Sequence, residues 1–301
     1  MALFAGIDVG GTNVKLGLCD DRMRPLARAS IPTDAARGPA DTVERIAVEV
    51  RRLAAGRAIQ AAAAGVPGPL DRARRVLFKA INLAGWDRVP FPAMLAKALG
   101  VPAFMENDAN CAAVGEYAAG AGRGAQCLVL YTLGTGVGGG IVIEGRLWAG
   151  ANGAAGELGH MTIAPDGPRC GCGQRGCVEA LASATAVARR YTELSRRNGV
   201  TARDIFSLAR RGDRAAKQTV NETARWLGIG IATMLHVLHP DVVVISGGMA
   251  AGAGLIAGAR AEVRRRVFPM YLKGLRIVRG SLGDDAGWIG AASTARERAA
   301  R

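Results

Sequence analysis

The sequence contains the same local pattern twice: an apolar, strand-like run ends in a glycine-rich turn and continues as a second strand-like run. In the first copy, residues 3–9 and 13–19 flank Gly10-Gly11-Thr12; in the second, residues 126–133 lead into five glycines within residues 134–140. Helical and strand-like patterns alternate after each copy. This repetition predicts an α/β protein with two similar mixed α/β domains that flank a cleft, and 301 residues are enough for two such cores.

Periodicity predicts the remaining elements. Strands are expected near residues 25–31, 60–66, 103–106, 140–143, 242–245 and 275–279, and helices over 41–55, from Asp108 to about 120, over 214–238, after Gly247-Gly248 and from about 285. We predict a small N-terminal domain of residues 1–112 joined by a C-terminal helix of about 286–301. Residues 113–285 are expected to form the larger domain.

The formal net charge of +14 raises the question of whether the protein binds nucleic acid. Its arginines are scattered, and basic stretches such as Arg72-Ala73-Arg74-Arg75 are typical of solvated turns or helix faces, so we expect no nucleic-acid partner. No apolar run approaches the roughly 20 residues of a membrane helix, and the N-terminus does not resemble a signal peptide. A cytoplasmic protein without a membrane partner is expected.

The two glycine turns are candidate phosphate loops, because glycine lets backbone N–H groups approach an anion closely. A Gly-Gly hairpin alone is often only a turn, and the second loop is neither a Walker A loop nor a clear dinucleotide fingerprint. Two such loops in matching positions favour a nucleotide site, with Asp8 placed to bind Mg²⁺. The expected nucleotide contacts are Asp8, Gly10, Gly11, Thr12, Lys15, Gly134, Thr135, Gly136, Gly138 and, at a strand end, Gly248.

Asp108 stands between the two loops in the sequence, at the end of an expected strand and the start of a helix. An isolated aspartate there could be only a helix N-cap. Phosphoryl transfer, however, needs a base that orients and deprotonates the attacking hydroxyl, and Asp108 suits that role. Amide, carboxylate and imidazole groups able to pair with sugar hydroxyls are also present: Asn82, Asn107, Glu157, His160 and Glu179.

Cys170, Cys172 and Cys177 lie within eight residues, ten residues after His160. In a reducing compartment such a cluster is more typical of a metal site than of disulfides. One imidazole and three thiolates suit a closed, tetrahedral structural Zn²⁺. Reduced structural cysteines are the alternative.

Five motifs, in order along the chain, resemble one known family: Asp8-Val9-Gly10-Gly11-Thr12, Glu106-Asn107-Asp108-Ala109-Asn110, residues 133–140, Gly156-Glu157-Leu158-Gly159-His160, and residues 170–179. Together they resemble the ROK family of bacterial sugar kinases and related sugar-responsive repressors. The resemblance implies an actin-like ATPase (ribonuclease H-like) fold and a homodimer, with a tetramer left open. It also implies that Asp108 is the base, that Gly65 joins the sugar-contacting residues, and that His160 and the three cysteines bind zinc.

Within this family the chain is most similar to the ATP-dependent glucokinases, so ATP and glucose are the expected substrates. N-acetylmannosamine, N-acetylglucosamine, allose and fructose stay open, because Cys177-Val178-Glu179-Ala180-Leu181 lacks the aromatic residues expected near the sugar and Ala184 replaces a usual glycine. Polyphosphate stays open as a donor. A repressor is not expected, since the seven residues before Asp8 are too few for a helix-turn-helix, and a non-catalytic sugar-binding protein is the other alternative.

Overall fold

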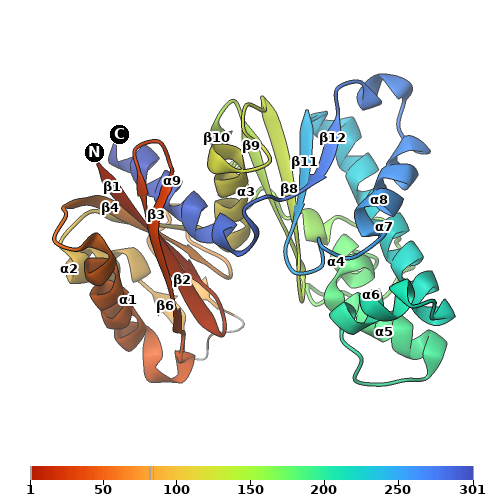
Figure 1. Ribbon diagram of the computed structural model, residues 1–301, viewed down its shortest axis with the longest axis horizontal. Helices are drawn as coiled ribbons and strands as arrows, with labels where there is room; N and C mark the ends of the chain where they lie inside the picture. Colours follow the sequence, from red (N-terminus) through yellow and green to blue (C-terminus); the bar gives the residue numbers. More distant parts are fainter. Residues whose placement is uncertain (1, 81–82, 84, 301) are drawn as a thin grey trace.

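The computed structural model describes residues 2–80, 83 and 85–300, and its two five-stranded sheets stand side by side (Figure 1). The first sheet has the order β3-β2-β1-β4-β7. Its strands are β1 (Leu3–Val9), β2 (Asn13–Asp20), β3 (Pro25–Pro32), β4 (Ile59–Val66) and β7 (Ala103–Asn107). The hairpin strands β1, β2 and β3 run antiparallel, whereas β4 and β7 lie parallel to β1.

The second sheet repeats this topology in the order β10-β9-β8-β11-β12. It consists of β8 (Cys127–Leu133), β9 (Val137–Ile143), β10 (Arg146–Leu147), β11 (Val242–Ser246) and β12 (Arg276–Arg279). Here too the first three strands are antiparallel and the last two are parallel to β8. The predicted α/β fold with two similar mixed halves is therefore confirmed, and each glycine turn joins the first two strands of its own sheet.

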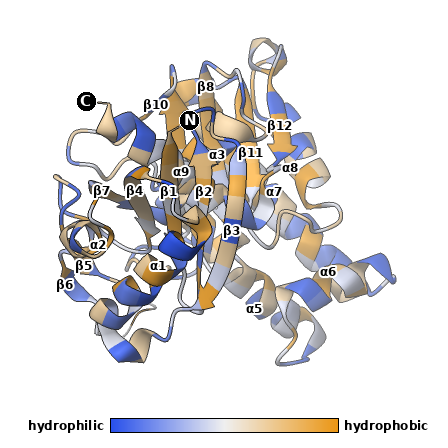
Figure 2. Ribbon diagram, turned by 60° about the vertical axis from the view of Figure 1, so that its left-hand side comes forward, coloured by the Kyte–Doolittle hydropathy of each residue, from blue (hydrophilic) through white to orange (hydrophobic). Residues whose placement is uncertain are grey.

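Helices cover the sheets because each buries one apolar face. On α1 (Gly38–Ala54), Val43, Ile46, Val50 and Leu53 are buried against the first sheet, next to α2 (Phe91–Leu99). The second sheet packs against α4 (Val178–Ala182), α5 (Ala184–Ser195), α6 (Ala202–Arg210), α7 (Arg214–Leu238) and α8 (Leu255–Arg264). Figure 2 shows hydrophobic colours on the central strands and polar residues on the outer helices α1 and α6.

Two helices lie between the sheets (Figure 1): α3 (Asp108–Ala119) and α9 (Ala286–Ala299). They cross so closely that a Cβ on Gly290 would overlap the carbonyl oxygen of Cys111. The helix α9 packs on β1 and β4, whereas α3 packs on β8 and β9 as well as on α9. The predicted association of the C-terminal helix with the first half agrees with this packing, and the domain boundaries stay a prediction.

The smaller elements are a two-stranded sheet, β5 (Leu77–Lys79) with β6 (Asp87–Val89), and the 3-10 helices η1 (Ala35–Arg37), η2 (Leu158–His160), η3 (Pro269–Leu272) and η4 (Gly283–Asp285). Among the described residues, no helix is both long and apolar enough to span a bilayer.

Two of the expected elements were wrong. The second glycine turn ends at Gly136, because Val137 already pairs with Leu133 in the sheet; Gly138 and Gly140 belong to β9, where a side chain would collide with Ala109 and Ala113 of α3. No helix opens directly after Gly247-Gly248, since α8 begins only at Leu255, so a helix N-terminus is not available at Gly248.

Candidate active site

Asp108 is the first residue of α3, directly after β7, and its neighbour Asn107 is the N-cap. The Asn107 Oδ1 accepts hydrogen bonds from the N–H groups of Ala109 and Asn110, at 2.9 and 3.2 Å. Capping is therefore done by Asn107, and the alternative that Asp108 is the helix N-cap is wrong. That carboxylate accepts a hydrogen bond from the Ala109 N–H at 2.9 Å.

The environment of Asp108 favours its protonated form. Burial raises the pKa of its carboxyl, and the negative charge of Glu157 raises it further, although the Ala109 N–H opposes the shift. A carboxyl whose pKa lies above its usual range takes up a proton more readily, as a general base must.

Asp8 lies on β1, close enough to Asp108 for the two charges to interact. Burial raises the pKa of Asp8 to about 7, the charges of Asp108 and Asp284 raise it too, and Lys15 opposes them. Lys15 is the cross-strand neighbour of Asp8 and forms an ion pair with Asp284 at 3.1 Å. The negative charges of Asp8 and Asp108 repel each other, and a cation bound nearby would reduce this repulsion. The site therefore fits Mg²⁺.

The first glycine turn is held at its base: the Gly10 N–H donates to the Asn13 carbonyl at 3.0 Å, and the Thr33 hydroxyl donates to the Gly10 carbonyl at 2.6 Å. Gly11 and Thr12 at its tip are exposed. The Thr12 carbonyl accepts from the Thr33 N–H at 2.8 Å, so the N–H groups at the exposed tip are the ones that the nucleotide-contact prediction can use.

The second glycine turn is held by α5. The Gly134 carbonyl accepts from the Ala184 N–H at 2.9 Å, and the Thr135 carbonyl accepts from the Thr185 hydroxyl at 2.9 Å. No described atom outside their immediate neighbourhood lies within 4 Å of the position that a Cβ would take on Gly134 or Gly248. The space on the Cβ side of Gly134 and Gly248 is therefore open, whereas the Gly134 N–H already donates to the Gly136 carbonyl at 3.0 Å.

Gly248 also lines a cavity of about 280 Å³ that sequence reasoning missed. Its walls include Arg203, Phe206 and Arg210 of α6. An aromatic ring flanked by guanidinium groups suits a planar base and its phosphates. These residues escaped prediction because α6 lies some 40 positions before Gly248 and only the fold brings it there.

The predicted metal ligands His160, Cys170, Cys172 and Cys177 come together, with their ligand atoms within 4.8 Å of one another. The Cys172 and Cys177 sulfurs are 3.7 Å apart, as are the Cys170 Sγ and the His160 Nδ1. Two sulfurs bound at about 2.3 Å to a tetrahedral zinc are about 3.8 Å apart, so the spacing fits Zn²⁺. Because His160 turns its Nδ1 to the cluster, its Nε2 stays available to another partner.

Glu179 links this cluster to the second glycine turn. Its Oε2 accepts from the Val137 N–H at 3.0 Å, and its Oε1 lies 3.4 Å from the Cys170 sulfur. The contact needs a glycine at position 136, since a Cβ there would overlap the Glu179 carboxylate. The turn and the cysteine loop are therefore one rigid unit.

A cavity beside Asp108 brings together several groups able to pair with hydroxyls: Asn107, Asn110, Glu157 and Asn152. Asn110 is 3% exposed, and its Oδ1 has no hydrogen-bond partner among the described residues. Gly65 lies next to this site, because a Cβ on it would be 3.5 Å from the Asp108 Cα. Of the predicted sugar contacts, Glu157 and Asn107 line the cavity, His160 and Glu179 lie at the cysteine cluster, and Asn82 is outside the described residues.

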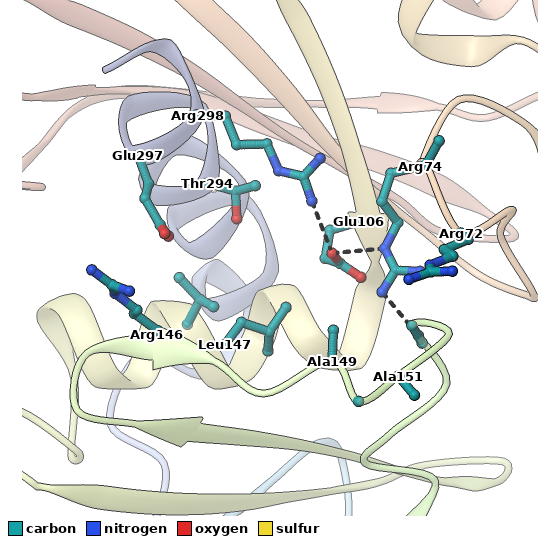
Figure 3. Close-up of a pocket in the computed structure, with 14 residues that line it drawn as sticks. Arg72, Arg74, Glu106, Arg146, Leu147, Ala149, Ala151, Thr294, Glu297 and Arg298 are labelled. Atoms are coloured by element: carbon teal, nitrogen blue, oxygen red, sulfur yellow. Dashed lines mark hydrogen bonds and ion pairs between the residues drawn. The ribbon is translucent and has the colours of Figure 1, made fainter. Parts of the chain in front are cut away.

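Behind Asp108, the buried Glu106 holds the strand–helix turn in place (Figure 3). Its Oε1 accepts from the Asn107 N–H at 3.0 Å and from the Asn110 Nδ2 at 3.1 Å, and its Oε2 lies 3.0 Å from the Nε of Arg74. Arg74 also donates to the Gly153 carbonyl at 2.9 Å. The expectation that residues 72–75 form a solvated turn is thus wrong for Arg74, which is buried between Glu106 and the loop that precedes Glu157.

The arrangement combines a carboxylate of raised pKa, a cavity lined by amides and carboxylates, and two open glycine turns. It can hold a polyhydroxy compound beside a base and phosphates beside backbone amides.

Comparison with known proteins agrees with this geometry. The sequence pattern of the ROK family matches residues 4–298. A glucokinase from Thermotoga maritima is 36% identical, over 97% of both chains. A ROK hexokinase structure from Thermus thermophilus superposes with a TM-score of 0.86 at 38% identity, over 98% of both chains. A ROK family glucokinase from Streptomyces griseus, in complex with glucose and AMPPNP, gives a TM-score of 0.83 at 32% identity and covers 98% of this chain and all of its own.

Proposed function

The chain belongs to the ROK family, and on that premise we propose that it is an ATP-dependent hexose kinase whose substrate is glucose. The observation that carries the proposal is Asp108, whose carboxyl has a raised pKa and lies beside the hydroxyl-pairing cavity and near Asp8 at the first glycine turn. The hexokinase and glucokinase relatives support the same reaction class.

In the reaction, Asp108 accepts the proton of the attacking sugar hydroxyl. The hydroxyl oxygen forms a bond to the γ-phosphorus of ATP as the bond from that phosphorus to the bridging oxygen breaks, and ADP leaves. Asn107 and Glu157 orient the sugar in the cavity beside Asp108. Backbone N–H groups of the two glycine turns hold the phosphates, and the cavity at Gly248 takes the adenosine.

Two metals complete the proposal. Asp8 would hold Mg²⁺ directly or through water, and the bound ion would supply positive charge that neutralises the phosphates. The His160 and cysteine cluster would hold a structural Zn²⁺, which braces the loop that carries Glu179. Both donor sets fit their ions by chemistry and spacing, as described above.

A cytoplasmic homodimer is the state we propose for this kinase, because its family resemblance implies a dimer and ATP is a cytoplasmic substrate. A role in the first step of glucose breakdown would follow from glucose phosphorylation.

The test is an ADP-release assay coupled to NADH oxidation over glucose, mannose, fructose, allose, N-acetylglucosamine and N-acetylmannosamine, with ATP and with polyphosphate as donors. We expect the highest kcat/KM for glucose with ATP. Another preferred sugar would overturn the glucose assignment alone, whereas no turnover with any sugar would overturn the kinase and favour a sugar-binding protein.

A further inference from the structure

We propose that the cavity shown in Figure 3 is a second binding site, outside the active site, for a small phosphate-bearing anion: inorganic phosphate or a phosphate monoester. The cavity has a volume of about 410 Å³, which lies in the range of small-molecule sites. Five separate parts of the chain form it: the loop before β5, Glu106 of β7, Val114 of α3, the segment from β10 to Gly153, and the end of α9.

The charged side chains that line the cavity are four arginines and two glutamates: Arg72, Arg74, Arg146, Arg298, Glu106 and Glu297. Figure 3 shows Arg72 and Arg74 on one side and Arg146 on the other, with Arg298 reaching toward Glu106. The lining therefore carries a formal net charge of +2.

Glu106 is not available to balance the other arginines. It is 1% exposed, and its Oε2 already faces the Arg74 Nε at 3.0 Å and an Arg298 nitrogen at 3.5 Å. Its Oε1 is engaged with Asn107 and Asn110. The buried Glu106 carboxylate therefore balances the charge of Arg74. The side chain of Arg298 remains one-third exposed at the cavity.

Arg72 and Arg146 are exposed, and neither guanidinium group forms a hydrogen bond or an ion pair within the described part of the chain. Other surface arginines, such as Arg24, Arg37 and Arg52, pair with a nearby acid. Guanidinium groups that line one concave site match the planar, multidentate donors that bind phosphate.

The site is also connected to the catalytic residues. Arg298 and Glu106 line it, and Glu106 fixes the turn that carries Asn107 and Asp108. An anion that binds Arg298 therefore contacts a partner of Glu106, and Glu106 in turn holds the turn that carries Asp108. It would also clamp segments that belong to both halves of the molecule, so binding should stabilise the fold.

The experiment is isothermal titration calorimetry of the full chain at low salt with two probes, inorganic phosphate and glycerol 3-phosphate. The double variant R72S/R146S removes two guanidinium groups from exposed positions of the cavity, and R75S, which removes one exposed arginine outside the cavity lining, is the control for the loss of a positive charge elsewhere. Each charge-assisted contact is worth a factor of about ten or more in affinity. We expect the wild type and R75S to bind alike and the double variant to bind at least about tenfold more weakly.

Equal affinity for the two probes assigns free phosphate as the ligand, and tighter binding of glycerol 3-phosphate assigns a monoester. The double variant should keep its kcat/KM for sugar in phosphate-free buffer, because neither residue lies in the active site. Unchanged phosphate affinity in R72S/R146S, an equal loss in R75S, or no binding by the wild type up to about 10 mM overturns the proposal.

Discussion

Replacing Asp8 with asparagine should make the protein more stable at neutral pH while abolishing its activity. Burial and the neighbouring Asp108 raise the pKa of Asp8 from 3.8 to about 7. The folded state therefore binds this proton more tightly than the unfolded chain does. Protonated Asp8 therefore stabilises the fold relative to ionised Asp8. This stabilisation is fully present below pH 4 and is lost as the pH rises through 7.

The two pKa values set the magnitude of the effect. A pKa that rises from 3.8 to about 7 corresponds to at most about 4 kcal/mol, since each tenfold change in proton affinity is worth about 1.4 kcal/mol. Asparagine has the same shape and never ionises, so the Asp8→Asn variant avoids this cost. In a chain of this size each kcal/mol shifts the melting temperature by roughly 2 °C, so the gain above pH 7 is up to roughly 8 °C.

The assay is differential scanning calorimetry of wild type and Asp8→Asn from pH 4.5 to 8.5 in magnesium-free buffer, with the exposed Asp21→Asn as control. The difference in melting temperature should be small at pH 4.5 and grow toward pH 8, and Asp21→Asn should show no such trend. A difference that is independent of pH, or a less stable variant at pH 8, would refute the electrostatic argument. Loss of turnover in the stabilised variant would show that Asp8 is kept for function.

Asp108→Asn should still bind sugar in a calorimetric titration, while kcat falls by a factor of roughly 10²–10⁴ because base catalysis is lost. Near-normal turnover would contradict the proposed mechanism. Elemental analysis should find about one zinc per chain, and Cys172→Ser should lose both zinc and thermal stability; a metal-free preparation that is stable and active would contradict this. Arg74→Met should lower the free energy of unfolding in urea by about 3–5 kcal/mol, because it removes the nearest partner of the buried Glu106. Arg298→Met removes the more distant partner and should cost much less. Equal effects of the two substitutions would show that Arg74 does not hold Glu106.

The repeated strand, glycine turn and strand predicted the fold because this information is local. Alternation of apolar residues and the position of glycine fix a hairpin, and two hairpins in one chain fix two similar halves. The end of the second turn was misjudged because Gly138 and Gly140 are required by α3, which packs directly on β9. In the sequence alone, a glycine that admits a neighbouring helix cannot be distinguished from a glycine that bends the chain.

Arg74 shows the corresponding limit for the site. Its sequence neighbours are charged, so local composition predicts a solvated turn. Its partners are 32 and 79 positions away, at Glu106 and Gly153, and only the folded chain brings them together. By contrast, Asn107, Asp108 and the cysteine cluster were found because each lies within a short motif whose spacing already implies chemistry.

The position of Asp108 also suits the proposed role of one base that serves two halves of a molecule. It directly follows β7 of the first sheet, and the helix that it begins packs on β8 and β9 of the second. Glu106 anchors this turn through Asn107 on the first side, and Ala109 lies against Gly138 on the other. The two halves meet at the crossing of α3 and α9, where Gly290 leaves no space for a side chain. Closure about this crossing would change the distance between the two glycine turns while Asp108 keeps its place on the helix between them.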